Sequence, residues 1–590
     1  MGSRWDLSDL YESFADPAFL QDRKTLESII AKLENWQEPD PAQSVSGTED
    51  FLQLLKKFHS YYTNLMAFAR LKLSVEAQND QAEKTVEKLE KLNTRLTGPK
   101  VKFQRWLQEQ DIESLKSKSD MISEHEFILK ELQEKSEYLL SEDEEVLVSE
   151  LKRTGSSAWA RLQQKLTSTL MVSITVEGEE KELPLSVVRN FAYKEDPELR
   201  QKGYRAELNA YEKIDDSVAA ALNGIKGEVI TMVEKRGYES PLQKTLLDSR
   251  MEQETLDAML ESMKEFLPVF QKYYRAKGEL LGHEEGLPFY DLFAPVGEAD
   301  MEFSFTEAKN FILDNVGQFS SSMADLFRQA FQENWIDAEP REGKRGGAFC
   351  YNIHPLGESR VLSNFSGSFS DMTTLAHELG HAYHGHCLKD ESILNSSYPM
   401  PLAETASIFS ETVVINAALE EADAEQTLAI LQNRLDQAGQ VIVDIYSRFL
   451  FESWLFENRD QASLSVDELK ELMQKAQIEA YGPGLDSDYL HPYLWLNKPH
   501  YYSAGNNYYN FPYAFGLLFG LGVYSQYLQE ESQKFLDRYD ELLKATGSKK
   551  VADVAAMADI DVRKRDFWEN SLEIIEEDIE SFVKLADQRK

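Results

Sequence analysis

Apolar side chains recur at helical spacing through most of this sequence. In the segment 82–96, four apolar residues fall on one stripe of a helix, and Glu and Lys cover its other faces. These four residues are Val86, Leu89, Leu92 and Leu96. The dipeptide Gly98-Pro99 then breaks the helical pattern. The acidic runs nearby are interpreted as solvated helix faces, so the pattern predicts a mainly α-helical fold.

Two stretches interrupt this periodicity with signs of β-structure. Residues 171–188 alternate and are rich in β-branched side chains, with Gly178 at a turn, which predicts a small hairpin. Residues 347–353 and 359–367 carry a second β signal just before a histidine-rich segment. From about Thr373 onward the helical pattern returns. We therefore expect a mainly α fold with a small β-sheet beside the histidine-rich helix.

Length and charge narrow the classes of fold and partner. A chain of 590 residues can bury a large core and form several domain-sized units. The 63 basic and 102 acidic side chains leave a net charge of −39. A field of this sign repels nucleic acid and anionic membranes, so we expect neither as a partner.

Cysteine content and apolar runs indicate the compartment. The two cysteines, Cys350 and Cys387, do not make a disulfide framework and are typical of the reducing cytoplasm. The N-terminal stretch MGSRWDLSDLYESF lacks the apolar run of an export signal. The longest apolar run, residues 513–524, is far shorter than the ~20 residues that span a bilayer. We predict a cytoplasmic protein with a buried helix at 513–524.

The stretch TTLAHELGHAYHGHC, residues 373–387, contains an H-E-x-x-H motif. His377 and His381 are four residues apart, so on a helix both imidazoles can reach one cation. Glu378 is rotated by about 100° around the helix, which places its carboxylate beside the open coordination position. Ser370 and Asp371 are the predicted N-caps of this helix. The motif predicts a catalytic metal site with its own base.

The third metal ligand has two candidates. His384 lies on the same helix face, but three ligands over two helical turns would span ~10 Å of rise, too far for one ion. Glu404 begins a second helix, which can cross the first and bring a carboxylate to the vacant corner. We therefore predict one Zn²⁺ ion bound by His377, His381 and Glu404, with His384 behind the ligands or facing substrate. Glu411 is interpreted either as a group that orients a ligand histidine or as a solvated helix glutamate.

The motifs HELGHAYH and AETASIFSE resemble those of the M3 family of zinc metallopeptidases, and most of all its oligoendopeptidase F branch. The resemblance covers nearly the whole chain, including RWDLSDLY, YKEDPELRQKGYRAE, RVLSNFSGSFSDMTTLAHELGH and HYYSAGNNYYNFPYAFG. It implies a helical ellipsoid with a deep substrate channel and the zinc ion at the channel floor. It also implies a preference for short unstructured peptides over folded proteins.

The same resemblance assigns roles to residues. The family's metal ligands match His377, His381 and Glu404, and its general base matches Glu378. A histidine and tyrosines near the C-terminus stabilise the transition state in the family. The matching residues here are His500 with Tyr508 or Tyr509, and Tyr501 and Tyr513 rank lower. We expect an N-terminal helical domain at residues 1–190 and a catalytic zinc metallopeptidase domain at residues 191–590.

These features predict a zinc-dependent oligoendopeptidase that hydrolyses internal bonds of oligopeptides. Zinc-bound water is the expected nucleophile, and Glu378 takes its proton and later delivers it to the leaving amine. The β segment 361–368 is expected to pair with extended substrate as an added strand, which would make side-chain specificity broad.

Two other functions fit parts of the pattern. A carboxypeptidase or dipeptidyl carboxypeptidase on a related helical fold would need a cation for the substrate's terminal carboxylate. Arg345 and Arg360 are candidates for that cation, although ordinary surface charge accounts for them as well. A peptide-binding helical scaffold with a structural zinc ion is the second alternative. Against it stands Glu378, which a closed structural site would not need.

Overall fold

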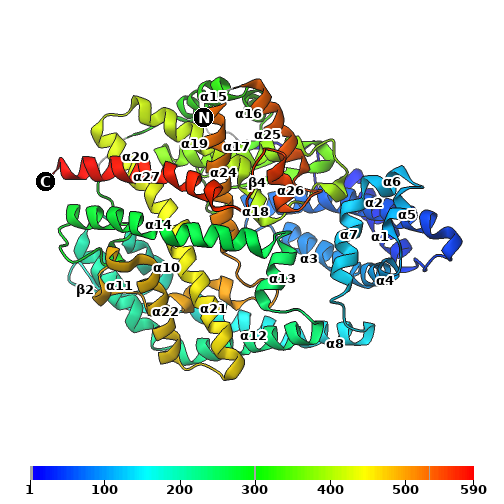
Figure 1. The fold of residues 1–590 in the computed structure, drawn as a ribbon, viewed down its shortest axis with the longest axis horizontal. Coiled ribbons are helices and arrows are strands. Elements are labelled where there is room, and N and C mark those ends of the chain that lie inside the picture. The colour runs from blue at the N-terminus through cyan, green and yellow to red at the C-terminus, as the bar shows by residue number, and fades with distance from the viewer. Residues whose placement is uncertain (1–3, 298–300, 531, 590) are drawn as a thin grey trace. The chain divides into compact units, whose positions relative to one another are not determined.

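The structure, a computed structural model, describes residues 4–297, 301–530 and 532–589. Helices form most of it, as Figure 1 shows, which confirms the predicted mainly α fold. The chain forms two compact units, each built from three separate segments. The first unit comprises Met1–Leu139, Met301–Ala417 and Gln526–Asp559, and the second comprises Leu140–Asp300, Ala418–Ser525 and Ile560–Lys590. The domain boundary expected near residue 190 stays a prediction.

The first unit contains a set of N-terminal helices and the elements around the H-E-x-x-H motif. Its helices are α1 (Pro17–Glu34), α2 (Ser44–Val75), α3 (Asp80–Thr94), α4 (Thr97–Gln108), α5 (Ile112–Lys116), α6 (Asp120–Glu124), α7 (Glu126–Ser136), α15 (Phe305–Phe319), α16 (Ser321–Gln332), α17 (Phe369–Cys387), α18 (Met400–Ala403), most of α19 (Thr405–Glu421), α25 (Gln533–Ala545) and α26 (Val551–Ala556).

The periodic segment at 82–96 forms α3, as predicted. Leu89 is buried in the core of the first unit, and Val86 and Leu92 pack against that core. The break lies just ahead of Gly98-Pro99, because both residues belong to the first turn of α4. Proline suits a first turn, where its missing N–H group would have no helical partner.

A three-stranded sheet lies beside α17 in the first unit. Its strands are β3 (Ile336–Asp337), β4 (Phe349–Ile353) and β5 (Glu358–Leu362), in the order β3-β5-β4. β5 pairs with β3 in parallel and with β4 in antiparallel orientation. The side-chain amide of Asn352 on β4 donates to the carbonyl of His381 on α17, over 3.2 Å. The small sheet expected beside the motif helix is therefore present.

The expectation that residues 361–368 add a substrate strand is wrong. Val361 and Leu362 belong to the central strand and already pair with neighbours on both sides. The N–H groups of Ser363 and Phe365 donate to the carbonyls of Asp337 and Ala338. The carbonyl of Gly367 accepts from the N–H of Phe303. The backbone groups that would bind a peptide are thus used by the first unit itself.

The second unit is a helical array with one β-hairpin. Its helices are α8 (Glu142–Thr154), α9 (Ser156–Ser168), α10 (Leu185–Arg189), α11 (Pro197–Tyr211), α12 (Asp215–Arg236), α13 (Pro241–Asp248), α14 (Gln253–Leu280), α20 (Ala424–Gly439), α21 (Ile445–Gln461), α22 (Val466–Tyr481), α23 (Leu494–Asn497), most of α24 (Phe511–Gln529) and α27 (Arg565–Asp587). α14 and α27 lie side by side (Figure 1).

The hairpin and the apolar helix of the second unit match their predictions. β1 (Met171–Val176) and β2 (Glu179–Pro184) are antiparallel, and Gly178 takes a φ of +81° at the turn. The apolar run at 513–524 lies in α24 and is largely buried. Within the described ranges of the chain, no helix is both long and apolar enough to cross a membrane.

Candidate active site

The helix that carries the motif begins with a capping box. The hydroxyl of Ser368 accepts the N–H of Asp371, and the Asp371 carboxylate accepts the N–H of Ser368, both over 3.1 Å. The same carboxylate accepts the N–H groups of Ser366 and Gly367. The predicted caps need correction, because Ser368 is the N-cap and Ser370 lies inside the helix. These contacts fix the end of α17 against the strand that precedes it.

Three side chains of the first unit bring their metal-binding atoms together. Nε2 of His377 lies 3.2 Å from Oε2 of Glu404, and Nε2 of His381 lies 3.4 Å from the same oxygen. All three ligand atoms lie within 4.8 Å of one another. Bonds of ~2.1 Å in a tetrahedral zinc site place ligand atoms roughly 3.4 Å apart. The two separations from Glu404 match this value, so His377, His381 and Glu404 could hold one metal ion.

The charges around these atoms favour a cation. Burial lowers the pKa of His377, but hydrogen bonds to Glu404 and Glu411 outweigh it and hold that pKa well above its ordinary value. Burial lowers the pKa of His381 to about 4, so this imidazole is neutral at pH 7. Two carboxylates thus face two imidazoles in a largely buried place. A divalent ion can replace the proton held there.

Glu404 reaches the histidines from the junction of two helices. α18 ends at Ala403 and α19 begins at Thr405, so Glu404 stands between them. The hydroxyl of Ser407 donates to Oε2 of Glu404 over 2.7 Å. Sequence reasoning did not identify Ser407, although its position three residues after Glu404, within one helical turn, is a usable signal.

α17 and α19 cross at unusually short range because Gly380 lacks a side chain. A Cβ atom at Gly380 would lie 2.5 Å from the carbonyl oxygen of Ala406 and 2.6 Å from Cα of Ser407. Close by, the hydroxyl of Ser410 donates to the carbonyl of Ala376 over 2.9 Å. The glycine beside the second histidine thus allows Glu404 to approach the motif.

The Gly380→Ala variant should lose both stability and zinc retention. The clash is with backbone atoms, so the two helices must separate, at a cost of about 1–3 kcal/mol. Thermal unfolding and the zinc content of the purified variant measure the effect. Gly317→Ala in α15 is the matched control, because there a Cβ would meet only Ala324, at 3.7 Å. Equal melting temperatures and zinc contents for the two variants would contradict the close crossing.

Glu411 orients His377. Its Oε2 lies 3.0 Å from Nδ1 of His377, and its side chain is only 14% exposed. A proton on Nδ1 that is shared with this carboxylate leaves Nε2 free to bind a metal. The alternative of a solvated helix glutamate is therefore wrong.

Glu378 lies in the motif but outside the group of possible ligands. Its side chain is 7% exposed, and burial raises its pKa to about 7. Neighbouring charges act in both directions, since His377 lowers this pKa while Glu404 and Glu411 raise it. A carboxylate with a pKa close to neutrality can both accept and return a proton.

His384 is a structural residue of the first unit. Its side chain is fully buried, its Nε2 lies 2.8 Å from the hydroxyl of Thr546, and its ring stacks on Tyr398 at 4.1 Å. It is not one of the three grouped ligands. Of the two positions predicted for it, the one facing substrate is wrong, because no surface of the ring is open.

The aromatic segment of the second unit separates its tyrosines. The ring of Tyr509 stacks on His500 at 4.8 Å, and the hydroxyl of Tyr513 lies 3.4 Å from that of Tyr509. Tyr508 faces the other way, with its ring 5.2 Å from Phe449 and only 7% of its surface exposed. Of the tyrosines predicted to work with His500, the structure brings Tyr509 and Tyr513 into its cluster.

A buried ion pair sets this arrangement. Nζ of Lys226 bonds Oε1 of Glu452 at 2.7 Å and Oδ1 of Asn507 at 2.9 Å. The other oxygen of Glu452 accepts the N–H of Tyr508 over 3.0 Å. Tyr508 takes a φ of +51°, a value that non-glycine residues adopt only when surrounding contacts hold it. This turn sends the two adjacent tyrosine side chains to different environments.

Arg345 and Arg360, the candidate cations for a carboxypeptidase, do not form a site for a substrate carboxylate together. Arg360 is fully buried and pairs with Glu358 at 2.9 Å and Asp9 at 3.2 Å. It holds the N-terminal segment and is closed to a substrate carboxylate. Arg345 is exposed, with its guanidinium 5.8 Å from the ring centre of Phe349.

Two sequence profiles match this chain. One is described as Peptidase family M3 and matches residues 190–574, and the other is described as Oligopeptidase F and matches residues 106–171. The first match alone spans more than half of the sequence. This chain belongs to peptidase family M3. The family predicted from the motifs is thereby confirmed, and the protein is a metalloendopeptidase that acts on oligopeptides and needs a catalytic metal.

Curated relatives and a solved structure match this chain over nearly its whole length. Oligopeptidase PepF of Bacillus subtilis is 23% identical over 593 residues, covering 98% of this chain and 87% of the relative. An oligoendopeptidase F homolog of Borreliella burgdorferi is 24% identical over 607 residues, covering 99% and 98%. The crystal structure of oligoendopeptidase F from Enterococcus faecium superposes with a TM-score of 0.73 at 19% identity, covering 97% and 99%. This likeness confirms the fold.

Proposed function

We propose that this M3 peptidase is a zinc-dependent oligoendopeptidase that cleaves internal bonds of short unstructured peptides. One observation supports the proposal most strongly. Nε2 of His377, Nε2 of His381 and Oε2 of Glu404 converge, and the motif supplies Glu378 as a separate carboxylate that is not one of these ligands. A structural zinc site would have four protein ligands and no use for such a base. We assign one zinc ion to these three residues.

The reaction divides between the metal and the chain's own groups. His377, His381 and Glu404 would hold the zinc ion, which would supply Lewis acidity to the attacking water and to the scissile carbonyl. Glu378 accepts the proton of the attacking water and returns it to the leaving amine. Burial keeps its carboxylate away from bulk solvent, so the proton passes to the reacting groups. Glu411 keeps His377 in the tautomer that ligation needs.

We also propose that His500 and Tyr509 donate hydrogen bonds to the oxyanion that forms on the carbonyl. The resemblance of the segment 500–515 to the M3 pattern and the stacked pair of His500 and Tyr509 support this role. Tyr513 is the next candidate, because its hydroxyl lies beside that of Tyr509. Loss of one such donor typically costs about 3–4 kcal/mol of transition-state stabilisation.

The Tyr509→Phe variant should lower kcat by ~100-fold or more, with KM and zinc content little changed, because it removes only a transition-state contact. Steady-state kinetics and metal analysis test this. Tyr508→Phe is the matched control, because its ring is packed against Phe449 in the core. A large kcat loss in Tyr508→Phe with none in Tyr509→Phe would assign the role to Tyr508. Unchanged kinetics in both variants and in His500→Ala would remove the segment from the mechanism.

Cleavage of an internally quenched peptide blocked at both ends tests the function. An endopeptidase cuts it between internal residues, loses activity with a chelator and regains it with Zn²⁺. A carboxypeptidase or dipeptidyl carboxypeptidase leaves the blocked peptide intact and cuts only the form with a free carboxylate. A stably folded globular protein offered at equal concentration should be spared, and its efficient digestion would contradict the preference for unstructured chains.

A further inference from the structure

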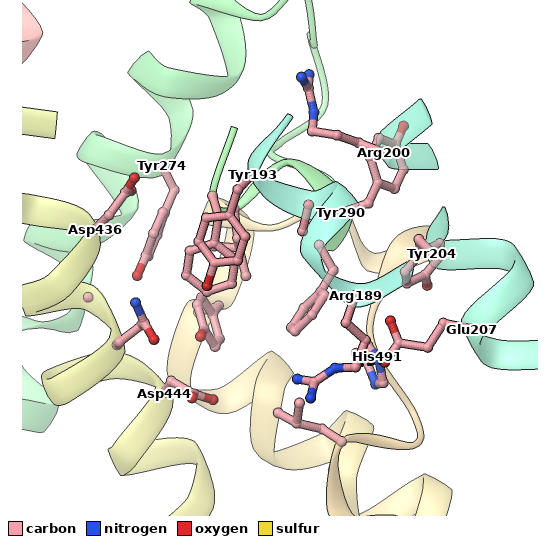
Figure 2. Close-up of a pocket in the computed structure, with 18 of the residues that line it drawn as sticks. Arg189, Tyr193, Arg200, Tyr204, Glu207, Tyr274, Tyr290, Asp436, Asp444 and His491 are labelled. Carbon is pink, nitrogen blue, oxygen red and sulfur yellow. Dashed lines mark ion pairs between the residues drawn. The ribbon is translucent and has the colours of Figure 1, made fainter. Parts of the chain in front are cut away.

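The second unit contains a pocket of about 890 Å³, its open mouth included. Residues from α10, α11, α14, α20 and α22 line it, together with the segments 192–193, 289–293, 440–444 and 491–498. Figure 2 shows labelled side chains entering it from several of these elements. None of its lining residues belongs to the predicted catalytic or metal-binding set.

Most of the charged groups that line the pocket are neutralised by partners. Asp436 accepts two hydrogen bonds of 2.8 Å from Lys277. Arg200 pairs with Asp291 at 2.6 Å. Glu207 lies 3.2 Å from Nε of Arg189, and it also accepts from the Tyr211 hydroxyl and contacts His491. The lining therefore carries few free charges.

Lys498 is the exception. It lines the pocket, and its ammonium group has no hydrogen-bond or ion-pair partner within the part of the chain that the structure describes. Burial lowers its pKa to about 8. The charge of Arg448 lowers this pKa further, and the charge of Asp444 acts in the opposite direction. The group is still mainly protonated at pH 7. No carboxylate of the described residues forms a direct ion pair with it, although the charges of Asp444 and Glu207 act on it from farther away. A buried charge of this kind is costly unless something pairs with it.

Asp444 adds an unused acceptor. One of its oxygens pairs with Arg448, whereas Oδ1 is buried and has no partner among the described residues. In Figure 2, Asp444 and the guanidinium end of Arg189 point toward the middle of the pocket from opposite sides. A ligand here would meet the guanidinium of Arg189 on one side and a hydrogen-bond acceptor on the other.

The remaining walls are aromatic. Tyr193 stacks on Phe293 with ring centres 5.1 Å apart, and Tyr274 lies 5.4 Å from Tyr481. Tyr193 is 57% exposed, which is a large free area for a side chain that lines a pocket. Such rings bind a flat or apolar group by burying its surface and by offset stacking.

We propose that this pocket binds the C-terminal residue of a short peptide. Its free carboxylate would pair with Lys498 and Arg189, its N–H or ammonium group would donate to Asp444, and its apolar or aromatic side chain would lie against the tyrosine wall. A multiply charged phosphate fits less well, because the pocket has one unmatched cation and Asp444 would repel it. The proposal rests on the oligopeptide specificity of the family, and it does not depend on which residues hold zinc.

Direct binding to a catalytically inactive enzyme tests the pocket. The dipeptide Ala-Phe is titrated calorimetrically into the zinc-loaded Glu378→Gln protein, in parallel with its C-terminal amide. We expect the free acid to bind at least tenfold more tightly than the amide. Adding Lys498→Met should remove that difference, since only the carboxylate uses the ammonium group. Equal affinities of acid and amide, or a preference that survives Lys498→Met, would overturn the proposal.

Two controls distinguish this pocket from surface charge and from the metal centre as the place where the carboxylate binds. Lys235→Met removes an exposed lysine of α12, 65% exposed, and should leave the preference intact. Glu404→Ala in the same background should also leave it intact, because none of the residues that line the pocket is one of the predicted metal ligands. Loss of dipeptide binding in Glu404→Ala would place the carboxylate at the metal centre and overturn the proposal. A lowered melting temperature of Lys498→Met with unchanged binding would show a purely structural lysine.

Inhibition kinetics distinguish whether the carboxylate in the pocket belongs to the substrate or to a released product. If the substrate's own terminus occupies the pocket, Ala-Phe is a competitive inhibitor, and amidation of a substrate raises KM with little change in kcat. If a released product occupies it, the dipeptide lowers kcat and leaves KM nearly constant. Absence of any inhibition at dipeptide concentrations that saturate the calorimetric site would contradict a role in turnover.

Discussion

Replacing Glu378 with Gln is expected to abolish peptide hydrolysis while the protein keeps its zinc. The residue is not one of the three grouped ligands, so metal binding has no need of it. Gln has nearly the same size and fits the same buried space, but it cannot accept the proton of the attacking water. General-base catalysis typically contributes about 10²–10⁴-fold, and the loss of kcat should fall in that range. Turnover of a quenched peptide measures the loss of activity, and metal analysis of the same sample measures the retained zinc.

Glu391→Gln is a suitable control for this variant. Glu391 follows the end of α17, its carboxylate is 26% exposed, and its partner is Lys544 at 3.6 Å. The same chemical change there should leave kcat within a factor of two or so, because exposed ion pairs contribute about 0–1 kcal/mol. Near-normal kcat in Glu378→Gln would show that another group takes the proton, and the assignment would fail.

Replacing Glu404 with Ala is expected to yield a protein that purifies largely without zinc and is inactive. Its Oε2 faces both ligand histidines at 3.2 and 3.4 Å, so its removal leaves only two protein ligands. His384→Ala should keep its zinc, because that ring bonds Thr546 and stacks on Tyr398. Metal analysis after gel filtration distinguishes the two variants.

Stability measurements complete this comparison. His384→Ala leaves a cavity in the core of the first unit and should lower the melting temperature, whereas loss of zinc in Glu404→Ala should make that temperature insensitive to added Zn²⁺. Glu411→Ala should lose less zinc than Glu404→Ala and more than His384→Ala. We expect a loss of metal affinity of about 10–100-fold, because Glu411 acts through His377. Zinc loss in His384→Ala together with zinc retention in Glu404→Ala would give the third ligand to His384.

Sequence reasoning identified the motif helix and its two histidines because their geometry is local. The spacing of His377 and His381 puts both rings on one face of any helix that contains them. The rise of the helix argued against His384, and the choice of Glu404 agrees with the ligand atoms that the structure groups. The small sheet was also predictable, because β-branched and aromatic residues cluster before the motif.

Contacts between distant segments account for the expectations that failed. β5 is the central strand because β3, more than 20 residues earlier, pairs with it, and nothing local in 361–368 shows that partner. The N-cap of α17 is Ser368 and not Ser370, because the Asp371 carboxylate accepts hydrogen bonds from N–H groups of the preceding turn. Both outcomes depend on hydrogen-bond partners that a local pattern does not name.

By itself, the sequence determined the helical class and the pair of motif histidines, since these follow from periodicity and from spacing within about one helical turn. The family followed from the resemblance of the motifs to those of the M3 peptidases. Only the tertiary structure decided that Glu411 orients His377, that Tyr509 and not Tyr508 stacks on His500, and that Lys498 faces an aromatic pocket without a partner. The physical reason is that burial and pairing depend on which helices cross. Adjacent tyrosines look alike in sequence, and a buried ion pair from two remote helices directs them to different environments.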